Sequence, residues 1–452
     1  MNKAILNGII FIALIINVFT VNAQYKYDKS VPEYPVNYYV PKTDEVKSVV
    51  DRIYNRAKIN AVFSVYDSST GDKITSLLVQ NKNAVIPNSI SSFVEWSYPN
   101  GVTLSACHAL SEITGDKEYA DYANSFFDFT FKAMPYFRKL KEDNMIKNHI
   151  YEKMINMKAL DHCGSITAAL IKTHKKYPDT RYRMWIDTVD NYISNKQFRF
   201  KDKTIARERP QPESLWADDM YMCVPFLAQM GSLTGNKKYY DDAVRQVVQL
   251  SERLYDEKSG LYDHGWNVNS SQYDPQIHWG RANAWCTMAM AELLSVLPEN
   301  HKGRSKVLHL FRSHIQALSA LQDGTGLWHN LLDRNGTYLE TSASAMFVYC
   351  IAKGINEGWI SHVYGPYAVT GWNAVATRVK SNGEVSGIVE GTTFAHDNAY
   401  YYYRGTNSKT NFYGTVMYAG AEMIRLLNNP KLQIAEPKPD AVNSAMHFLM
   451  KK

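Results

Sequence analysis

The chain has 452 residues, of which 45% are hydrophobic and 21% are charged, so it can bury a large core. The formal net charge of +6 is small for this length, and no run of lysine or arginine stands out. This balance argues against the basic stripe that binds nucleic acid, and we expect no nucleic-acid partner. It is compatible with a small anionic substrate but does not require one.

The first 23 residues have the pattern of a secretory signal peptide. A basic start at Lys3 precedes an almost wholly apolar stretch at 5–21, and Ala23 ends a small-residue cleavage site. A membrane anchor is the alternative, but the apolar stretch is short for a full span. We therefore expect a bacterial protein that is exported to the periplasm or the medium, with no membrane span after cleavage.

Five cysteines mark a repeat along the rest of the chain. They are spaced about 56 to 64 residues apart, and each lies among small and apolar residues at helical spacing. A sixth segment of this kind, at 413–422, lacks the cysteine. Periodicity at this length is typical of a repeat architecture. We interpret the thiols as buried apolar groups, because an odd number does not give a full disulfide framework. The cysteines are Cys107, Cys163, Cys223, Cys286 and Cys350.

Amphipathic helices are predicted before and between these segments, because the apolar residues there recur at intervals of three and four positions. Six small-residue helices thus alternate with six amphipathic ones. The arrangement predicts an all-α fold, an (α/α)6 barrel, with the small-residue helices inside. An open α-solenoid is the alternative, but it fits the irregular aromatic loops less well. No linker is apparent, so we expect one domain over residues 24–452. The predicted amphipathic segments are 44–57, 117–129, 181–195, 237–250, 304–318 and 367–378.

Short β-hairpins are expected in some of the loops. Segment 327–338 contains Asn335-Gly336, a strong turn signal. Segments 260–266 and 385–405 are further candidates, the second because tyrosine alternates there with polar residues.

Polar residues gather where the predicted inner helices begin. Asp161, Asp218, Asp219, Arg281 and Glu340 all occupy such positions, and in a toroid these starts converge on one rim. A lone aspartate there is usually a helix cap, but two beside a tryptophan favour a functional role for one. Adjacent residues lie about 100° apart around a helix. One of the pair should therefore enter the central cleft while the other caps or orients.

Arg281 lies between Trp279 and Trp285, which suits a clamp for a carboxylate. The alternative is an arginine packed on tryptophan. His264 and His329 each lie close to a tryptophan, although a lone histidine is usually structural.

Several motifs together resemble glycoside hydrolase family 105, the unsaturated glucuronyl or galacturonyl hydrolases related to family 88. The most specific are Trp-Ala-Asp-Asp at 216–219 and Trp-Gly-Arg-Ala-Asn-Ala-Trp at 279–285. Segments 95–101, 160–165, 327–329, 338–346 and 419–422 also agree, so the resemblance covers nearly the whole mature chain.

The resemblance implies an (α/α)6 barrel and removal of a 4,5-unsaturated uronic acid from the non-reducing end of oligosaccharides left by polysaccharide lyases. It implies that Asp218 protonates the double bond and activates water, while Asp161 is a second catalytic aspartate that holds sugar hydroxyls. No metal and no cofactor are required. The expected substrate-binding residues are Tyr98, Trp216, Asp219, His264, Trp279, Arg281, Trp285 and His329.

Three regions depart from the family pattern. His162 stands where many members carry an aspartate or another polar group, segment 206–213 does not align, and segment 392–406 is unusual. The polymer of origin, rhamnogalacturonan or ulvan, therefore stays open.

Two alternative functions also remain. One is an ordinary glycosidase or a lyase, since Asp161 and Asp218 could supply paired carboxylates. The other is a non-catalytic oligosaccharide-binding protein.

Overall fold

The computed structural model describes residues 39–87, 93–271, 274–407, 412–435 and 446–451. The predicted signal peptide at 1–23 lies outside these residues. Within them, no helix has both the length and the apolar character needed to cross a membrane.

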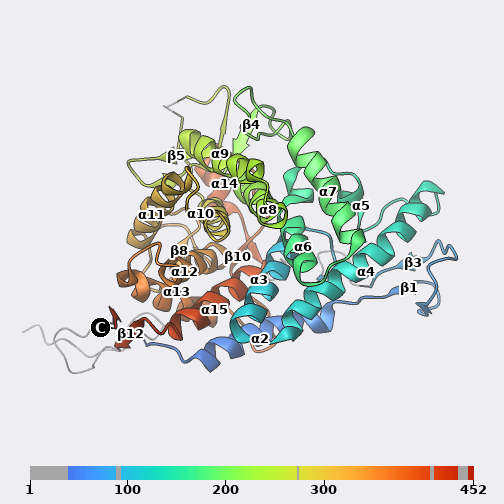
Figure 1. The fold of residues 1–452 in the computed structure, drawn as a ribbon, viewed down its shortest axis with the longest axis horizontal. Coiled ribbons are helices and arrows are strands. Elements are labelled where there is room, and N and C mark those ends of the chain that lie inside the picture. The colour runs from blue at the N-terminus through green and yellow to red at the C-terminus, as the bar shows by residue number, and fades with distance from the viewer. Residues whose placement is uncertain (1–38, 88–92, 272–273, 408–411, 436–445, 452) are drawn as a thin grey trace, which may run out of the picture. The chain divides into compact units, whose positions relative to one another are not determined.

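Six helices form a closed inner ring (Figure 1). Each packs against the next in chain order, and the last packs against the first. This closure confirms the predicted (α/α)6 barrel and excludes the open solenoid. The inner helices are α3 (Tyr98–Thr114), α6 (Gly164–Lys176), α8 (Asp218–Thr234), α10 (Gly280–Leu294), α12 (Thr341–Asn356) and α15 (Tyr413–Leu427).

Six further helices form an outer layer, each packed mainly on one inner helix. They are amphipathic as predicted: α9 buries Tyr240, Val247 and Leu250 on one side and leaves lysines on the other. The outer helices are α2 (Thr43–Asn60), α4 (Lys117–Glu142), α7 (Thr180–Asn195), α9 (Lys237–Leu254), α11 (Arg304–Ala320) and α13 (Gly365–Thr377).

The inner helices are buried on nearly all sides, which explains their small residues. All five cysteines are buried and none forms a disulfide. Close helix approach depends on glycine at two crossings. A Cβ on Gly164 would lie 1.6 Å from the carbonyl oxygen of Met222, and one on Gly101 would lie 2.5 Å from the amide of Ile166. These crossings draw the starts of α3, α6 and α8 together.

Short antiparallel strand pairs occupy the loops at which inner helices begin. Strand β8 (Trp328–His329) pairs with β9 (Leu339–Glu340), which confirms the hairpin predicted at 327–338. The hairpin predicted at 260–266 is wrong. Its residues divide between β6 (Leu261–Tyr262), which pairs with β5 (Tyr255–Asp256), and β7 (Gly265–Asn267), which pairs with β4 (Ser214–Trp216).

The segment 385–405 is only partly a hairpin. Strand β10 (Ile388–Val389) pairs with β11 (Thr406–Asn407), but the tyrosine-rich stretch between them forms the short helix α14 (Asn398–Tyr403). Asp397 caps this helix by accepting from the amide of Ala399, so a local cap outweighs the alternating pattern. The residues from 389 to 405 are called the strap below.

The remaining elements are peripheral or very short. Two small sheets comprise β1 (Val65–Asp67) between β2 (Lys73–Ile74) and β3 (Ala84–Val85), and β12 (Leu432–Ala435) with β13 (His447–Met450). The short helices are α5 (Glu152–Ile155), η1 (Leu160–His162) and η2 (His362–Tyr364).

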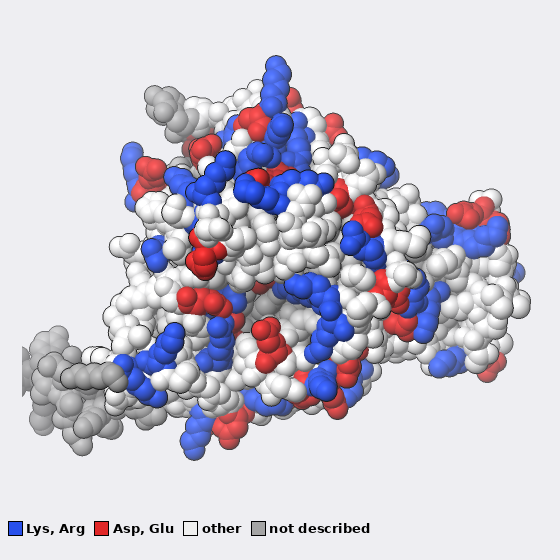
Figure 2. Space-filling view, in the orientation of Figure 1, with Lys and Arg blue, Asp and Glu red and all other residues white. Residues whose placement is uncertain are grey.

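A polar chamber of about 1080 Å³ lies where the inner helices end. Lys172 donates to Glu292 at 2.7 Å and to Tyr418 at 3.0 Å, and Tyr349 donates to Glu292 at 2.7 Å. The face in Figure 2 is hollowed over the middle of the ring, with charges of both signs around the hollow. The predicted acids lie at the helix starts, at the opposite end of the ring from this chamber.

Candidate active site

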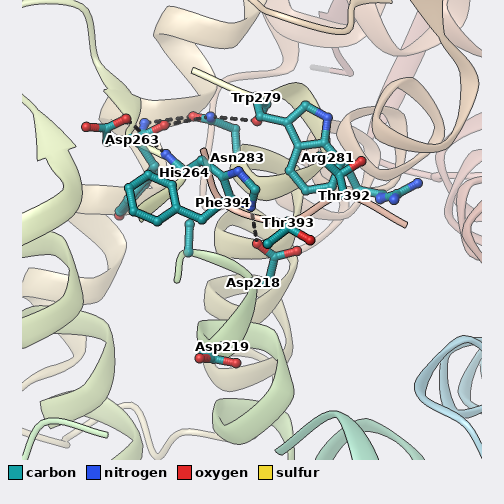
Figure 3. A network of polar contacts seen from close by, with 12 residues as sticks. Asp218, Asp219, Asp263, His264, Trp279, Arg281, Asn283, Thr392, Thr393 and Phe394 are labelled. Atoms are coloured by element: carbon teal, nitrogen blue, oxygen red, sulfur yellow. Dashed lines mark hydrogen bonds and ion pairs between the residues drawn. The ribbon is translucent and has the colours of Figure 1, made fainter. Parts of the chain in front are cut away.

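Asp218 and Asp219 occupy the first turn of α8, directly after β4. Their carboxylates point apart, Asp218 toward His264 and Asp219 away from it (Figure 3). This is the divergence that helix geometry predicts for adjacent residues.

The side chains of Asp218 and His264 are in contact. Oδ2 of Asp218 lies 3.2 Å from Nε2 of His264, and neither atom has another hydrogen-bond partner among the described residues. His264 is fully buried, whereas the Asp218 side chain is 16% exposed, so the carboxylate can meet a ligand. The other ring nitrogen of His264, Nδ1, lies 2.6 Å from the hydroxyl of Tyr401 in the strap. That hydroxyl also accepts from the amide of Ala395.

The charges around Asp218 favour its ionised form. Burial alone raises the pKa of this carboxyl, but His264, Arg207 and Arg281 together hold the pKa below its usual value. The groups around Asp218 therefore favour its carboxylate form at neutral pH. For Asp218 to act as an acid, a proton must arrive with the ligand or from the solvent.

Asp219 is bound by an arginine that the sequence interpretation did not single out. Arg207 donates through Nε and Nη2 to the two carboxylate oxygens of Asp219, at 2.7 and 2.6 Å. Its guanidinium lies over the ring of Trp216, 4.0 Å from the centroid. Burial raises the pKa of Asp219 to about 6, and the Arg207 guanidinium opposes that rise. Asp219 is therefore the buried counter-ion of Arg207.

Asp161 lies in η1, next to this pair. Its Oδ1 is 3.4 Å from Nη2 of Arg207, and its side chain is 35% exposed. Tyr98, at the start of α3, is within electrostatic reach of Asp161, Asp218, Arg207 and Arg281, and burial raises its pKa. The predicted residues Asp161, Asp218 and Tyr98 thus converge, although they come from three separate elements, η1, α8 and α3.

Arg281 binds backbone and not a side-chain acid. Its two terminal nitrogens donate to the carbonyl oxygens of Val389 and Glu390, at 2.6 and 2.8 Å. The guanidinium also lies over the rings of Phe412 and Trp279, at 4.4 and 4.8 Å. The side chain expected to clamp a carboxylate therefore anchors the strap.

The strap completes the wall beside Asp218. Phe394 packs edge-on against His264 with ring centroids 5.9 Å apart, and its carbonyl oxygen accepts from Gln211. Figure 3 draws Thr393 and Phe394 on the side of Asp218 that faces away from Asp219. Segment 392–406 departs from the family pattern, and that departure was the only sequence signal for Phe394 and Tyr401.

The predicted tryptophans are mostly packed and not exposed. The ring of Trp279 lies 4.6 Å from that of His264, and its indole donates to Asn330 at 3.0 Å. Trp285 lies deeper, with its ring 4.7 Å from that of Tyr221. Both are about 1% exposed, so they support neighbouring groups, while Trp216 lies beneath Arg207.

His329 is not brought to the carboxylates. Its Nδ1 donates to the carbonyl oxygen of Thr337 at 2.6 Å, and its Nε2 lies 3.5 Å from Asp323. Both partners are in the loop around β8 and β9, so the structure shows these contacts of His329 while its role in substrate binding stays a prediction. Glu340 is structural, because it caps α12 by accepting from the amides of Ser342 and Ala343.

Metal ligation and thiol chemistry receive no support from the described part of the chain. No group of three or more histidine, cysteine, aspartate or glutamate residues could hold a metal ion within it. Burial raises the pKa of all five cysteine thiols, so none of them is an activated nucleophile.

The site lies within a region that resembles known proteins. The sequence matches Glycosyl Hydrolase Family 88 over residues 71–427. It is 26% identical to an unsaturated rhamnogalacturonyl hydrolase, YesR, of Bacillus subtilis, over 71% of this chain and 86% of the relative. It is 27% identical to an unsaturated 3S-rhamnoglycuronyl hydrolase of an Alteromonas species, over 38% and 43% of the two chains. A possible member of the GH105 family from Salmonella enterica shares the fold, with a TM-score of 0.69, 22% identity and coverage of 86% and 95%.

Proposed function

Because this chain belongs to glycosyl hydrolase family 88, we propose that it removes a 4,5-unsaturated uronic acid from the non-reducing end of oligosaccharides made by polysaccharide lyases. The relatives named for rhamnogalacturonyl and rhamnoglycuronyl substrates support substrates of the rhamnogalacturonan or ulvan type. The observation that carries the proposal is Asp218 itself: a partly exposed carboxylate at a helix start, paired with a buried histidine, inside the matched region.

The proposed reaction is hydration of a vinyl ether. The Asp218 carboxyl donates its proton to C4 of the sugar, and the positive charge that develops at C5 is met by water. The Asp218 carboxylate takes the proton that this water releases, so the residue ends as it began. The C5 hemiketal then opens by breaking its bond to the ring oxygen, which leaves a ketone at C5 and a hemiacetal at C1, and this hemiacetal expels the aglycone as an alcohol. Asp161 is placed to accept hydrogen bonds from sugar hydroxyls, since its side chain is partly exposed.

Substrate binding helps to protonate Asp218. His264, Arg207 and Arg281 favour the carboxylate form of Asp218. A bound uronate brings a like charge close to Asp218 and displaces water, and both effects raise the pKa of a carboxyl group. The anionic substrate thus favours the acid form of Asp218 when the double bond is present.

The test is a panel of lyase products followed by ultraviolet absorbance. The proposed enzyme removes the absorbance of the unsaturated sugar, whereas a lyase would create it and an ordinary glycosidase would act on saturated chains. Asp218→Asn should fold normally and leave the absorbance unchanged. Asp187→Asn, which alters an exposed pair with Arg183, is the matched control and should keep full activity. Full activity of Asp218→Asn would rule out the assigned role.

We also propose that the protein is exported, with residues 1–23 removed. Support comes from the basic start, the apolar stretch and the site at Ala23. Amino-terminal sequencing of protein from the producing cell should begin at Gln24, and retention of Met1 would contradict export by this signal.

A further inference from the structure

Arg207 is fixed in place from two sides. Its backbone amide donates to the carbonyl oxygen of Ser214 at 2.8 Å, which ties it to the strand leading into α8. Its guanidinium donates to both carboxylate oxygens of Asp219 and stacks on the ring of Trp216. A guanidinium held by a bidentate carboxylate and an aromatic face is oriented before any ligand arrives.

One edge of this guanidinium is not used by the protein. Nε and Nη2 bind Asp219, and Nη2 also reaches Asp161 at 3.4 Å. Among the residues that the structure describes, none forms a hydrogen bond with Nη1, and the Arg207 side chain is 13% exposed. Two N–H donors of Arg207 are therefore available to an incoming acceptor.

The other arginine near Asp218 is not available in this way. Arg281 is 2% exposed, and both of its terminal nitrogens are bound to carbonyl oxygens of the strap. Binding a ligand through them would release Val389 and Glu390, at the cost of two charge-assisted hydrogen bonds. Arg207 needs no such exchange.

Arg207 also lies at the right place for the reacting sugar. It is close enough to Asp218 to influence its charge, and it contacts Asp161 directly. Tyr98 is within electrostatic reach of all three. The C5 atom of an unsaturated uronic acid carries the carboxylate, so a group that binds the carboxylate must lie next to the residue that protonates C4.

We propose that the Nη1 edge of Arg207 binds the carboxylate of the terminal uronic acid and so determines the preference for acidic over neutral sugars. The inference rests on the proposed function for the identity of the sugar. Asp219 is then a positioning residue, which acts through Arg207 and does not touch the substrate. The segment that does not align with the family, 206–213, thereby supplies a specificity residue.

The test compares an acid with its neutral ester. Binding of galacturonate and of its methyl ester is measured by calorimetry at 25 °C, with wild-type protein, Arg207→Met and Arg199→Met. Arg199 is the matched control, since it forms a bidentate pair with Asp242 at 3.0 and 2.9 Å outside the site, and both side chains are 16% exposed. Turnover of an unsaturated disaccharide and of its methyl ester is followed in parallel by absorbance.

We expect Arg207→Met to weaken galacturonate binding and to lower kcat/KM on the free acid about 10- to 100-fold, the effect of losing one hydrogen bond to a charged group. Binding of the ester should change less than about threefold, the ratio of kcat/KM on acid to that on ester should fall about 10- to 100-fold, and Arg199→Met should keep the wild-type ratio. An equal loss on acid and ester, or an unchanged ratio in Arg207→Met, overturns the inference.

Two further variants separate binding from folding. Arg207→Lys keeps the positive charge and should retain part of the preference for the acid. Arg207→Met alone leaves Asp219 buried without its partner, so the double variant Arg207→Met, Asp219→Leu removes that unpaired charge. The double variant should still lack the preference for the acid. A wild-type protein that binds galacturonate but removes no absorbance would refute the proposed function and leave the binding comparison valid.

Discussion

The pair of Arg207 and Asp219 should contribute measurably to stability. Their side chains are 13% and 2% exposed and share two short hydrogen bonds. Removing one partner of a buried pair costs about 3–5 kcal/mol because the other charge is left uncompensated. In Asp219→Asn the guanidinium keeps Asp161 at 3.4 Å, so we expect the lower end of that range, about 3 kcal/mol.

The assay is thermal unfolding at one fixed scan rate. Unfolding entropy is about 2.1 cal/mol/K per residue, so 1 kcal/mol corresponds to roughly 1 °C in a domain of about 400 residues. Asp219→Asn should therefore lower Tm by about 3 °C. Arg207→Met combined with Asp219→Leu should restore most of this loss, since an apolar pair can replace a buried ion pair. Asp187→Asn should change Tm by less than about 1 °C. A Tm of Asp219→Asn within 1 °C of wild type would refute the reasoning.

Three other predictions follow from the same structure. His264→Gln removes the main group that lowers the pKa of Asp218, while burial still raises it. The acid form of Asp218 should then persist to higher pH, so the alkaline limb of kcat/KM against pH should move to higher pH. An alkaline limb at the wild-type pH would contradict this. Gly164→Ala should prevent folding or lower Tm by many degrees, because its Cβ would lie 1.6 Å from the carbonyl oxygen of Met222, and a soluble variant with wild-type Tm would exclude that close crossing. All five cysteines should resist thiol labelling in the native protein and react after unfolding, and fast native labelling of any one would show that it is not buried.

The architecture could be predicted from the sequence because it repeats. Small residues recur once per helix pair, and amphipathic segments separate them, so the number of pairs and the inner and outer layers follow from the pattern. Closure of the ring was an inference from loop character, which the packing of α15 on α3 confirms. The loops were less predictable. The strands around residue 260 pair with partners distant in sequence, and no local pattern reveals such pairing.

The site was predictable in part. The residues of the Trp-Ala-Asp-Asp motif occupy the start of α8, and the convergence of Asp161, Asp218 and Tyr98 follows from the toroid. Arg207 could not be found in this way, because it precedes a strand and reaches the site through tertiary contacts alone. Tyr401 was missed for the same reason, since it contacts His264 across 137 positions of the sequence. Arg281 shows the converse. Its position between two tryptophans suggested a clamp for a carboxylate, but in the structure its side chain anchors the strap.

The central claim is that Asp218 protonates the double bond of an unsaturated uronic acid. The most direct measurement is the reaction of lyase-treated rhamnogalacturonan or ulvan in deuterated water, followed by ultraviolet absorbance and NMR of the released sugar. Wild-type protein should remove the absorbance and place deuterium at C4, while folded Asp218→Asn should do neither. Loss of absorbance at the wild-type rate with Asp218→Asn, or a product without deuterium at C4, would contradict the account.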